Sequence, residues 1–276
     1  MAEKPGAIIA VDKPRQWTSF QVVNKLKWHL KREFGLKKIK IGHAGTLDPL
    51  ASGLLLVCIG SATKQIEQLQ AGTKVYSGTM VLGATTPCYD MEQPIGRYYP
   101  YEHITPEAIE SVRRQFVGEI DQVPPMFSAV KVDGRRAYVS ARDGAAVDIE
   151  PRTVTIHDFS INAFRTGHER PEGVADGPVG DTPALGRELY RNPQDVVPGW
   201  LPQLDFSITC SKGTYIRSIA RDFGDALGSG AFLSALRRER IGDYSIVDAI
   251  TLESVPTVIT RDNPVFKPFA ELPKEA

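Results

Sequence analysis

A glycine-rich turn that leads into a long apolar run is the feature that most constrains this chain. Residues 42–55 read GHAGTLDPLASGLL, and the apolar run continues to Ile59. Proline disfavours the α region for the residue before it, so Asp48, which precedes Pro49, is expected in an extended or turn conformation. A strand behind a glycine-rich loop is a common way to present a side chain to a ligand.

Two interpretations of Asp48 stay open on this pattern alone. In most Asp-Pro turns the aspartate bonds its own backbone, and Asp48 fits that structural role. The alternative is a reactive carboxylate, which is ionised at neutral pH and can form and release a covalent bond. His43 lies five residues upstream, and Gly45 and Gly53 allow a close approach of the backbone to a ligand.

A longer stretch around this turn resembles a known family. Residues 40–55, KIGHAGTLDPLASGLL, are similar to the signature of the bacterial tRNA pseudouridine-55 synthases of the TruB type, whose catalytic aspartate has the same Leu-Asp-Pro context. The resemblance runs from about Gly6 to about Ile250 and is interrupted once. Further blocks in family order are DKP at 12–14 with Thr18 and Ser19, KVY at 74–76, PPMFSAVK at 124–131 and CSKGTYIR at 210–217.

The resemblance implies an isomerase that converts uridine 55 in the T-arm of tRNA to pseudouridine. It assigns Asp48 as the nucleophile, Arg217 as the cation that pairs with it, and Tyr76 as the aromatic face on which a flipped uridine stacks. A role of the Tyr76 hydroxyl as a base stays open, because a phenol with a pKa of about 10 is a poor base at neutral pH unless a neighbouring charge lowers that pKa. It implies His43 and Leu236 as substrate-binding residues. Lys64 and Lys74 are further candidates, as contacts to phosphates of the substrate.

Each of these residues also has an ordinary structural interpretation. Arg217 is typical of an exposed helix face, Tyr76 and Leu236 of a core, and Lys64 of a solvated surface. The surrounding family blocks favour the functional roles of Arg217 and Tyr76, whereas both interpretations of Lys64 and Leu236 stay open. The reaction breaks and remakes a bond to the same base, so we expect no cofactor, metal or nucleotide, and neither a guide RNA nor an obligatory protein partner.

The charge of the chain is unevenly distributed. The formal net charge is zero, which by itself argues against an RNA partner. Residues 1–40, however, carry ten Lys or Arg against three acids, and residues 211–240 carry six against three. Each cluster is either a solvated helix face or a contact surface for tRNA.

The pattern of apolar residues predicts an α+β fold with a mixed, largely antiparallel sheet and flanking helices. The first helix is expected to be capped by Thr18 or Ser19. Its predicted apolar face is Phe20, Val23, Leu26, Leu30 and Phe34. The expected strands are 6–12, 38–41, 53–59, 74–82, 127–132, 153–164, 204–210 and 244–250, and the other expected helices are 62–69, a helix opening at 105–107, 215–227 and 232–238.

The domain organisation follows the interruption in the family pattern. Residues 1–250 are expected to form the catalytic domain, with a mobile insertion at 165–203 that contains twelve glycines or prolines in 39 residues. Residues 251–276 are too few for the RNA-binding domain found in longer relatives.

The cysteines 58, 88 and 210 lack metal-ligand spacing and are expected to be reduced. The chain shows neither a membrane span nor a signal peptide, which favours the cytoplasm.

Three alternative functions are distinguishable on the sequence. A hydrolase of N-glycosides usually needs two carboxylates, and we find no partner for Asp48 in comparable context. A non-catalytic RNA-binding module is expected to have lost Asp48, Tyr76 or Arg217. A guide-RNA-dependent relative normally carries a C-terminal domain. The atom that Asp48 attacks, at the ribose or at the base, stays open.

Overall fold

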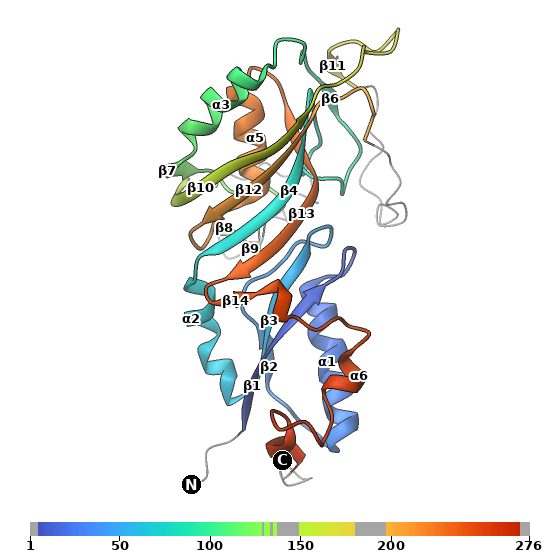
Figure 1. The fold of residues 1–276 in the computed structure, drawn as a ribbon, viewed down its shortest axis with the longest axis vertical. Helices are drawn as coiled ribbons and strands as arrows, with labels where there is room; N and C mark the ends of the chain where they lie inside the picture. Colours follow the sequence, from blue (N-terminus) through green and yellow to red (C-terminus); the bar gives the residue numbers. More distant parts are fainter. Residues whose placement is uncertain (1–4, 129, 133–134, 137–148, 180–196, 271–276) are drawn as a thin grey trace. The chain divides into compact units, whose positions relative to one another are not determined.

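The computed structural model divides into two compact units (Figure 1). The first holds residues 1–76 and 237–276, and the second holds residues 77–236. The described residues are 5–128, 130–132, 135–136, 149–179 and 197–270.

The first unit contains a small sheet centred on an antiparallel pair of strands. Its strands are β1 (Gly6–Lys13), β2 (Ile41–His43), β3 (Ser52–Gly60), the end of β13 (Ala231–Ile241) and β14 (Tyr244–Ser245). β1 pairs with β3 from Gly6 opposite Gly60 to Lys13 opposite Gly53. β2 is antiparallel to β3, and β14 to β13, whereas the end of β13 runs parallel to β3.

Strand β3 is apolar on both faces because both faces are covered. Leu55, Val57 and Ile59 lie in one buried cluster, and Leu54 and Leu56 lie in another. The alternation of side chains along a strand accounts for this division. The continuous apolar run in the sequence is therefore a strand buried on both sides, and it forms a rigid base next to the Asp48 loop.

Helix α1 (Ser19–Phe34) begins and ends at clear sequence signals. Thr18 is the N-cap, and it forms a capping box with Gln21. Gly35 ends the helix in the left-handed conformation, with φ of 68°. The predicted inward face is wrong in one position, because Phe20 is 68% exposed. Val22 takes its place in the core.

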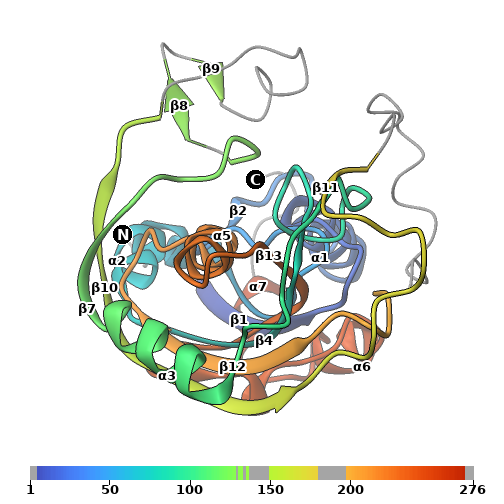
Figure 2. The ribbon, with the colours of Figure 1, turned by 90° about the horizontal axis from the view of Figure 1, so that it is seen from above.

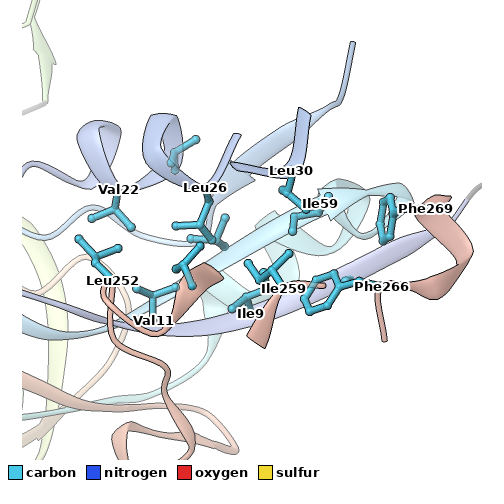
Figure 3. Close-up of a cluster of buried hydrophobic side chains, with 14 of the residues drawn as sticks. Ile9, Val11, Val22, Leu26, Leu30, Ile59, Leu252, Ile259, Phe266 and Phe269 are labelled. Atoms are coloured by element: carbon cyan, nitrogen blue, oxygen red, sulfur yellow. The ribbon is translucent and has the colours of Figure 1, made fainter. Parts of the chain in front are cut away.

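The main core of the first unit lies between α1, the sheet and the C-terminal segments (Figure 3). Val22, Leu26 and Leu30 of α1 face Ile9 and Val11 of β1 there. The C-terminal part of the chain adds Leu252, Ile259, Phe266 and Phe269, from and around the short helices α6 (Val255–Val258) and α7 (Lys267–Ala270). Residues 252–269 are thus an integral part of this core.

The second unit is built on a sheet with the strand order β13, β4, β12, β10 and β7. The strands not yet located are β4 (Lys74–Leu82), which begins in the first unit, β7 (Gly118–Gln122), β10 (Arg152–Arg165) and β12 (Gln203–Cys210). β10 is antiparallel to both β12 and β7. The predicted α+β fold with a mixed, largely antiparallel sheet is confirmed.

Two helices cover this sheet through a cluster of phenylalanines. They are α3 (Pro106–Gln115), capped by Thr105, and α5 (Ile216–Ala226). The Phe223 ring of α5 lies 5.5 Å from that of Phe159 on β10 and 5.6 Å from that of Phe116. Figure 2 shows α5 inside the curve of β4, β12 and β10. This packing fixes α5, which carries Arg217.

Strand β13 corrects the prediction of a short helix at 232–238. Phe232, Leu233 and Leu236 have helical spacing, but the segment lies between β3 and β4 in the strand order and hydrogen bonds to its neighbours. Backbone hydrogen bonds to strands distant in sequence outweigh the weak local preference for a helix. Leu236 is therefore a half-buried strand residue.

Other predicted elements differ in their ends. The strand expected at 38–41 begins only at Ile41 and reaches His43, and the helix expected at 62–69 is the 3₁₀ segment η1 (Ser61–Gln65) followed by α2 (Ile66–Ala71). Among the described residues of the strand expected at 127–132, only Lys131–Val132 form a strand, β8, which pairs with β9 (Arg135–Arg136). The last predicted strand is β14 followed by η2 (Ile246–Asp248).

The described parts of the expected insertion at 165–203 make specific contacts, although none of the residues 165–179 is buried. β11 (Gly177–Pro178) joins β6 (Arg97–Tyr98), which pairs with β5 (Ala84–Thr85). The Arg170 guanidinium lies 5.6 Å from the centre of the Trp200 ring. The prediction of a mobile loop otherwise falls on residues 180–196, which lie outside the described residues.

Two further predictions can be compared with the structure. Cys58, Cys88 and Cys210 are buried and form no disulfide among the described residues, in agreement with the predicted reduced state. Among the helices of the described residues, none is both long enough and apolar enough to cross a lipid bilayer.

Candidate active site

The backbone of the Asp48 loop is held from both sides. Ser19, the first residue of α1, accepts a hydrogen bond from the Leu47 amide at 2.9 Å and donates one to the Leu47 carbonyl at 3.2 Å. The Gln16 amide donates to the Pro49 carbonyl at 2.7 Å. Asp48 itself is half-buried. The loop therefore fixes the backbone of this aspartate while its side chain stays within reach of solvent.

Gln16 adopts an unusual conformation to make its contact. Its φ is 68°, in the left-handed region that residues other than glycine rarely occupy. Such strain of about 1–3 kcal/mol persists only where surrounding interactions hold it, and it is concentrated at functional sites. The hydrogen bond to Pro49 is one such interaction.

A buried lysine lies beside the same loop. The Lys13 side chain is fully buried, and its Nζ donates to the carbonyls of Trp17 (2.6 Å), Pro14 (3.1 Å) and Pro49 (3.3 Å). Burial lowers the pKa of Lys13 to about 8, and the nearby charge of Asp48 opposes that shift. Lys13 thus connects β1 to the residue that follows Asp48.

Arg238 is a second buried cation next to the loop. It is 1% exposed, and it donates to the carbonyls of Leu54 (2.8 Å), Gly45 (3.0 Å) and Thr46 (3.4 Å). Gly53 makes room for it, because a Cβ on Gly53 would lie 2.4 Å from the Arg238 carbonyl oxygen. Gly53 also has a φ of +103°. Both properties require glycine at this position.

The residue before Arg238 joins β13 to β1. The Arg237 guanidinium contacts both carboxylate oxygens of Asp12, with Nη2 to Oδ2 at 2.7 Å and Nη1 to Oδ1 at 3.1 Å. A bidentate arginine–carboxylate pair has a fixed geometry. Asp12 directly precedes Lys13, so the ion pair and the buried lysine lie on adjacent residues of the same strand.

The other predicted site residues of this unit differ in exposure. His43 ends β2 and is half-buried; burial, and then the charge of Arg238, lower its pKa, so the ring is neutral at pH 7. Tyr76 on β4 is 9% exposed. Lys64 lies on η1 with an exposed side chain. Lys74, considered as a phosphate contact, is buried and donates to the Gly72 carbonyl at 2.6 Å.

Arg217 occupies the second position of α5 and is buried. Its Nη1 donates to the Cys88 carbonyl at 3.2 Å, and its Nη2 donates to the Phe127 carbonyl at 2.9 Å. Its Nε lies 3.7 Å from Oδ2 of Asp90. A surface role for Arg217 is therefore excluded, because these contacts hold the guanidinium within the second unit.

Asp90 is the acidic partner that the sequence analysis missed. It is 6% exposed, and its Oδ1 accepts hydrogen bonds from the Glu92 amide (2.9 Å) and the Cys88 thiol (3.0 Å). Tyr89, between Cys88 and Asp90 in the sequence, has a φ of 58°. The motif Cys-Tyr-Asp carries no recognised signal, so only the folded turn identifies it.

A glutamine fixes the start of α5. Gln122, at the end of β7, accepts from the Tyr215 amide at 2.8 Å and donates to the Tyr215 carbonyl at 3.2 Å. The Ser218 hydroxyl donates to the Val123 carbonyl at 2.8 Å. The two Gln122 bonds satisfy backbone groups of Tyr215, the N-cap of α5, and all three bonds hold the first turn that carries Arg217.

Cys88, Asp90 and Glu92 bring three possible metal ligands together in the described residues. These three residues do not fit a metal site, because the Asp90 carboxylate already accepts hydrogen bonds from the Cys88 thiol and the Glu92 amide and pairs with Arg217. Burial, and then the charge of Asp90, raise the pKa of Cys88, so the residue is a neutral thiol that donates. Metal binding to cysteine requires the thiolate.

The predicted residues therefore form two groups. Asp48, His43, Lys64 and Tyr76 belong to the first unit, whereas Arg217 and Leu236 belong to the second. The pairing of Asp48 with Arg217 stays a prediction. Lys13 and Arg238 were missed as site residues, although the DKP block and the basic run at 237–240 contained them.

Comparison with sequence families gives two matches. Residues 31–171 match the family described as TruB family pseudouridylate synthase (N terminal domain). Residues 217–265 match the tRNA pseudouridylate synthase B C-terminal domain.

Relatives similar over most of their length are described as tRNA pseudouridine synthases. "tRNA pseudouridine synthase B" of Phocaeicola vulgatus is 45% identical over 253 residues, which cover 92% of this chain and 93% of that protein. The protein of the same description from Flavobacterium johnsoniae is 47% identical over 248 residues, covering 90% of this chain and 93% of that one.

Solved structures also share the fold. The chain in a Cbf5-Nop10-Gar1 complex is 25% identical with a TM-score of 0.59, and the match covers 98% of this chain and 60% of that one. The archaeal box H/ACA sRNP Nop10-Cbf5 complex is 23% identical with a TM-score of 0.57, covering 97% and 58%. This chain therefore spans about 60% of the solved chain's length.

Proposed function

The chain belongs to the TruB family of pseudouridylate synthases, and we propose that it converts uridine 55 in the T-arm of tRNA to pseudouridine. The observation that carries this proposal is the Asp48 loop. Its backbone is bonded on both sides of Asp48, by Ser19 at Leu47 and by Gln16 and Lys13 at Pro49. A fixed carboxylate with access to solvent is the reagent that this reaction needs.

The reaction is an isomerisation in which no atom is gained or lost. The bond between uracil N1 and ribose C1′ breaks, the base turns, and C5 bonds to C1′. N1 acquires a proton, and C5 loses its proton. Asp48 either attacks C1′, removes a ribose proton, or adds to uracil C6, and in each route it later leaves unchanged.

Arg217 and Tyr76 complete the proposed catalytic set. We assign Arg217 as the cation that pairs with Asp48 during the reaction. Its burial and its bonds to the Cys88 and Phe127 carbonyls support a fixed guanidinium. Tyr76 stacks on the flipped uracil and replaces stacking lost from the RNA.

Three further residues bind the substrate in this proposal. His43 braces the space that the flipped base vacates, and its neutral ring avoids placing a further charge next to Arg238. The exposed Lys64 meets a phosphate, and Leu236 lines the uracil pocket. Neither a guide RNA nor a protein partner is expected, and the cytoplasm stays the predicted location.

The proposal is tested with an unmodified tRNA transcript and the purified chain, without added guide RNA, metal or nucleotide. Tritium release from C5-labelled uridine, with mapping of the modified position, should show one pseudouridine at position 55. Asp48→Asn should lower the single-turnover rate by at least about 10⁴-fold. Asp243→Asn, which removes an exposed carboxylate from the same unit, should leave the rate unchanged.

Three results would contradict the proposal. Pseudouridine formation that survives Asp48→Asn would exclude this residue as the reagent. Release of free uracil would indicate a hydrolase of N-glycosides. Activity that appears only after a guide RNA is added would indicate guided modification.

A further inference from the structure

We propose that the solvent-exposed face of α1 binds the phosphate backbone of the tRNA next to the target loop. This inference rests on the proposed function, because it names the surface that holds the same substrate. We call this surface the α1 outer face. It consists of Phe20, Asn24, Lys27, Trp28, Lys31 and Arg32.

The outer face combines positive charge with exposed aromatic surface. Trp28 is 60% exposed and Phe20 is 68% exposed, and both lie on the side of the helix away from the core. The Arg32 guanidinium lies 5.2 Å from the centre of the Trp28 ring. Stacked arginine and aromatic planes over basic side chains are typical of surfaces that bind RNA.

The cations of this face have no acidic partner among the described residues. The acid of α1, Glu33, lies 3.9 Å from Arg261, measured from Oε1 to Nε. Lys27, Lys31 and Arg32 make no ion pair with any described carboxylate. A solvated helix stabilised by its own charge pairs would show acids three or four residues from these cations. The absence of such acidic residues from this face favours an anionic binding partner for its cations.

The position of α1 connects this face to the reactive loop. Ser19, the first residue of the helix, makes the two hydrogen bonds that hold Leu47 beside Asp48. A helix of 16 residues is about 24 Å long. The outer face, from Phe20 to Arg32, therefore begins next to the Asp48 loop and extends about 18 Å along the helix, which suits the backbone of an RNA whose uridine is bound at Asp48.

The test measures affinity and salt dependence with full-length unmodified tRNA. Lys27→Gln with Lys31→Gln should weaken binding about tenfold. The slope of log Kobs against log salt should fall by about 1.4–1.8, because each phosphate contact contributes about 0.7–0.9. The rate constant at saturating enzyme should stay within twofold of the wild type, because neither residue touches the reacting base.

A matched control separates this face from net charge. Lys267→Gln removes one exposed cation from α7, which packs through Phe269 against Phe34 on the buried side of α1, with ring centres 6.3 Å apart. It should leave affinity and slope unchanged, whereas Lys27→Gln alone should lower the slope by about 0.7–0.9. Equal effects of the two single substitutions would overturn the inference.

A second measurement needs no change on the outer face. With Trp17→Phe and Trp200→Phe, Trp28 is the remaining tryptophan, and bound tRNA should reduce its quenching by acrylamide. Unchanged quenching, or unchanged tRNA affinity of the variant with Lys27→Gln and Lys31→Gln, would overturn the inference. Either result would favour a protein or a second copy of this chain as the occupant of the outer face. Wild-type protein that makes no pseudouridine would instead contradict the proposed function, whatever the outer face binds.

Discussion

The Nζ of Lys13 lies 3.3 Å from the carbonyl oxygen of Pro49, the residue that directly follows Asp48. A fully buried ammonium group therefore holds the loop that carries the proposed nucleophile. Its hydrogen-bond acceptors are backbone carbonyls, and the charges of Asp48 and, to a smaller extent, Asp12 favour its protonated form.

The first prediction concerns pH. The unfolded chain binds the Lys13 proton up to about pH 10.5, whereas the folded chain binds it up to about pH 8. Stability contributed by this group therefore rises with pH between these values. Relative to Lys13→Met, the unfolding free energy of the wild type should increase by up to about 3 kcal/mol between pH 8 and 10.5. Urea unfolding of both proteins across this range measures the difference, and a constant difference would exclude a depressed pKa.

The second prediction concerns Arg238 and His43. Arg238→Met removes a positive charge that lowers the pKa of His43, so that pKa should rise, as imidazole NMR titration can measure. Three carbonyls lose their buried donor, which should cost about 1–3 kcal/mol of stability. Arg237→Met is the control, because Arg237 pairs with Asp12 and should leave the His43 titration unchanged. Equal shifts in both variants would show that the effect is not specific to Arg238.

The third prediction concerns the fit at Gly53. Gly53→Ala and Gly173→Ala both place a Cβ at positive φ, +103° and +86°. The new Cβ meets the Arg238 carbonyl oxygen at 2.4 Å in the first variant, and nothing within 4 Å in the second. Gly173→Ala should cost about 1 kcal/mol, and Gly53→Ala about 3 kcal/mol or more. Thermal unfolding compares them, and similar losses would mean that the contact with Arg238 yields easily.

The fourth prediction concerns Asp90. Asp90→Asn removes the charge beside Arg217 but keeps the shape of the side chain, and Arg217 retains its bonds to the Cys88 and Phe127 carbonyls. We expect a loss of about 1–3 kcal/mol of stability. Pseudouridine formation should also slow, because the guanidinium is less firmly held. Asp121→Asn, at an exposed site that bonds Thr153, should change neither quantity.

Much of the fold follows from local patterns in the sequence. The apolar run after Gly53 predicts β3, and the Thr18 to Gln21 capping box with Gly35 sets both ends of α1. The Thr105–Pro106 start of α3 is likewise recognisable. These signals lie within one turn or one strand, so neighbouring residues are sufficient to read them.

Other parts were decided by contacts across long distances in sequence. The segment 232–238 has helical spacing, but β3 and β4 hold it as part of β13. Arg238 then reaches Leu54, and Arg217 reaches Asp90. No local pattern reports which backbone carbonyl or carboxylate lies nearby after folding, so the burial of these arginines could not be predicted.

The sequence by itself determined the family, the turn that carries Asp48 and the proposal that this aspartate is the reactive group. The tertiary structure decided what holds that turn. Lys13, Ser19 and Arg238 contact this turn. The turn residues to which they hydrogen bond lie 28 to 193 positions away from them in the chain. Motifs preserve reactive groups, whereas rigidity depends on which distant donors and acceptors the fold brings together.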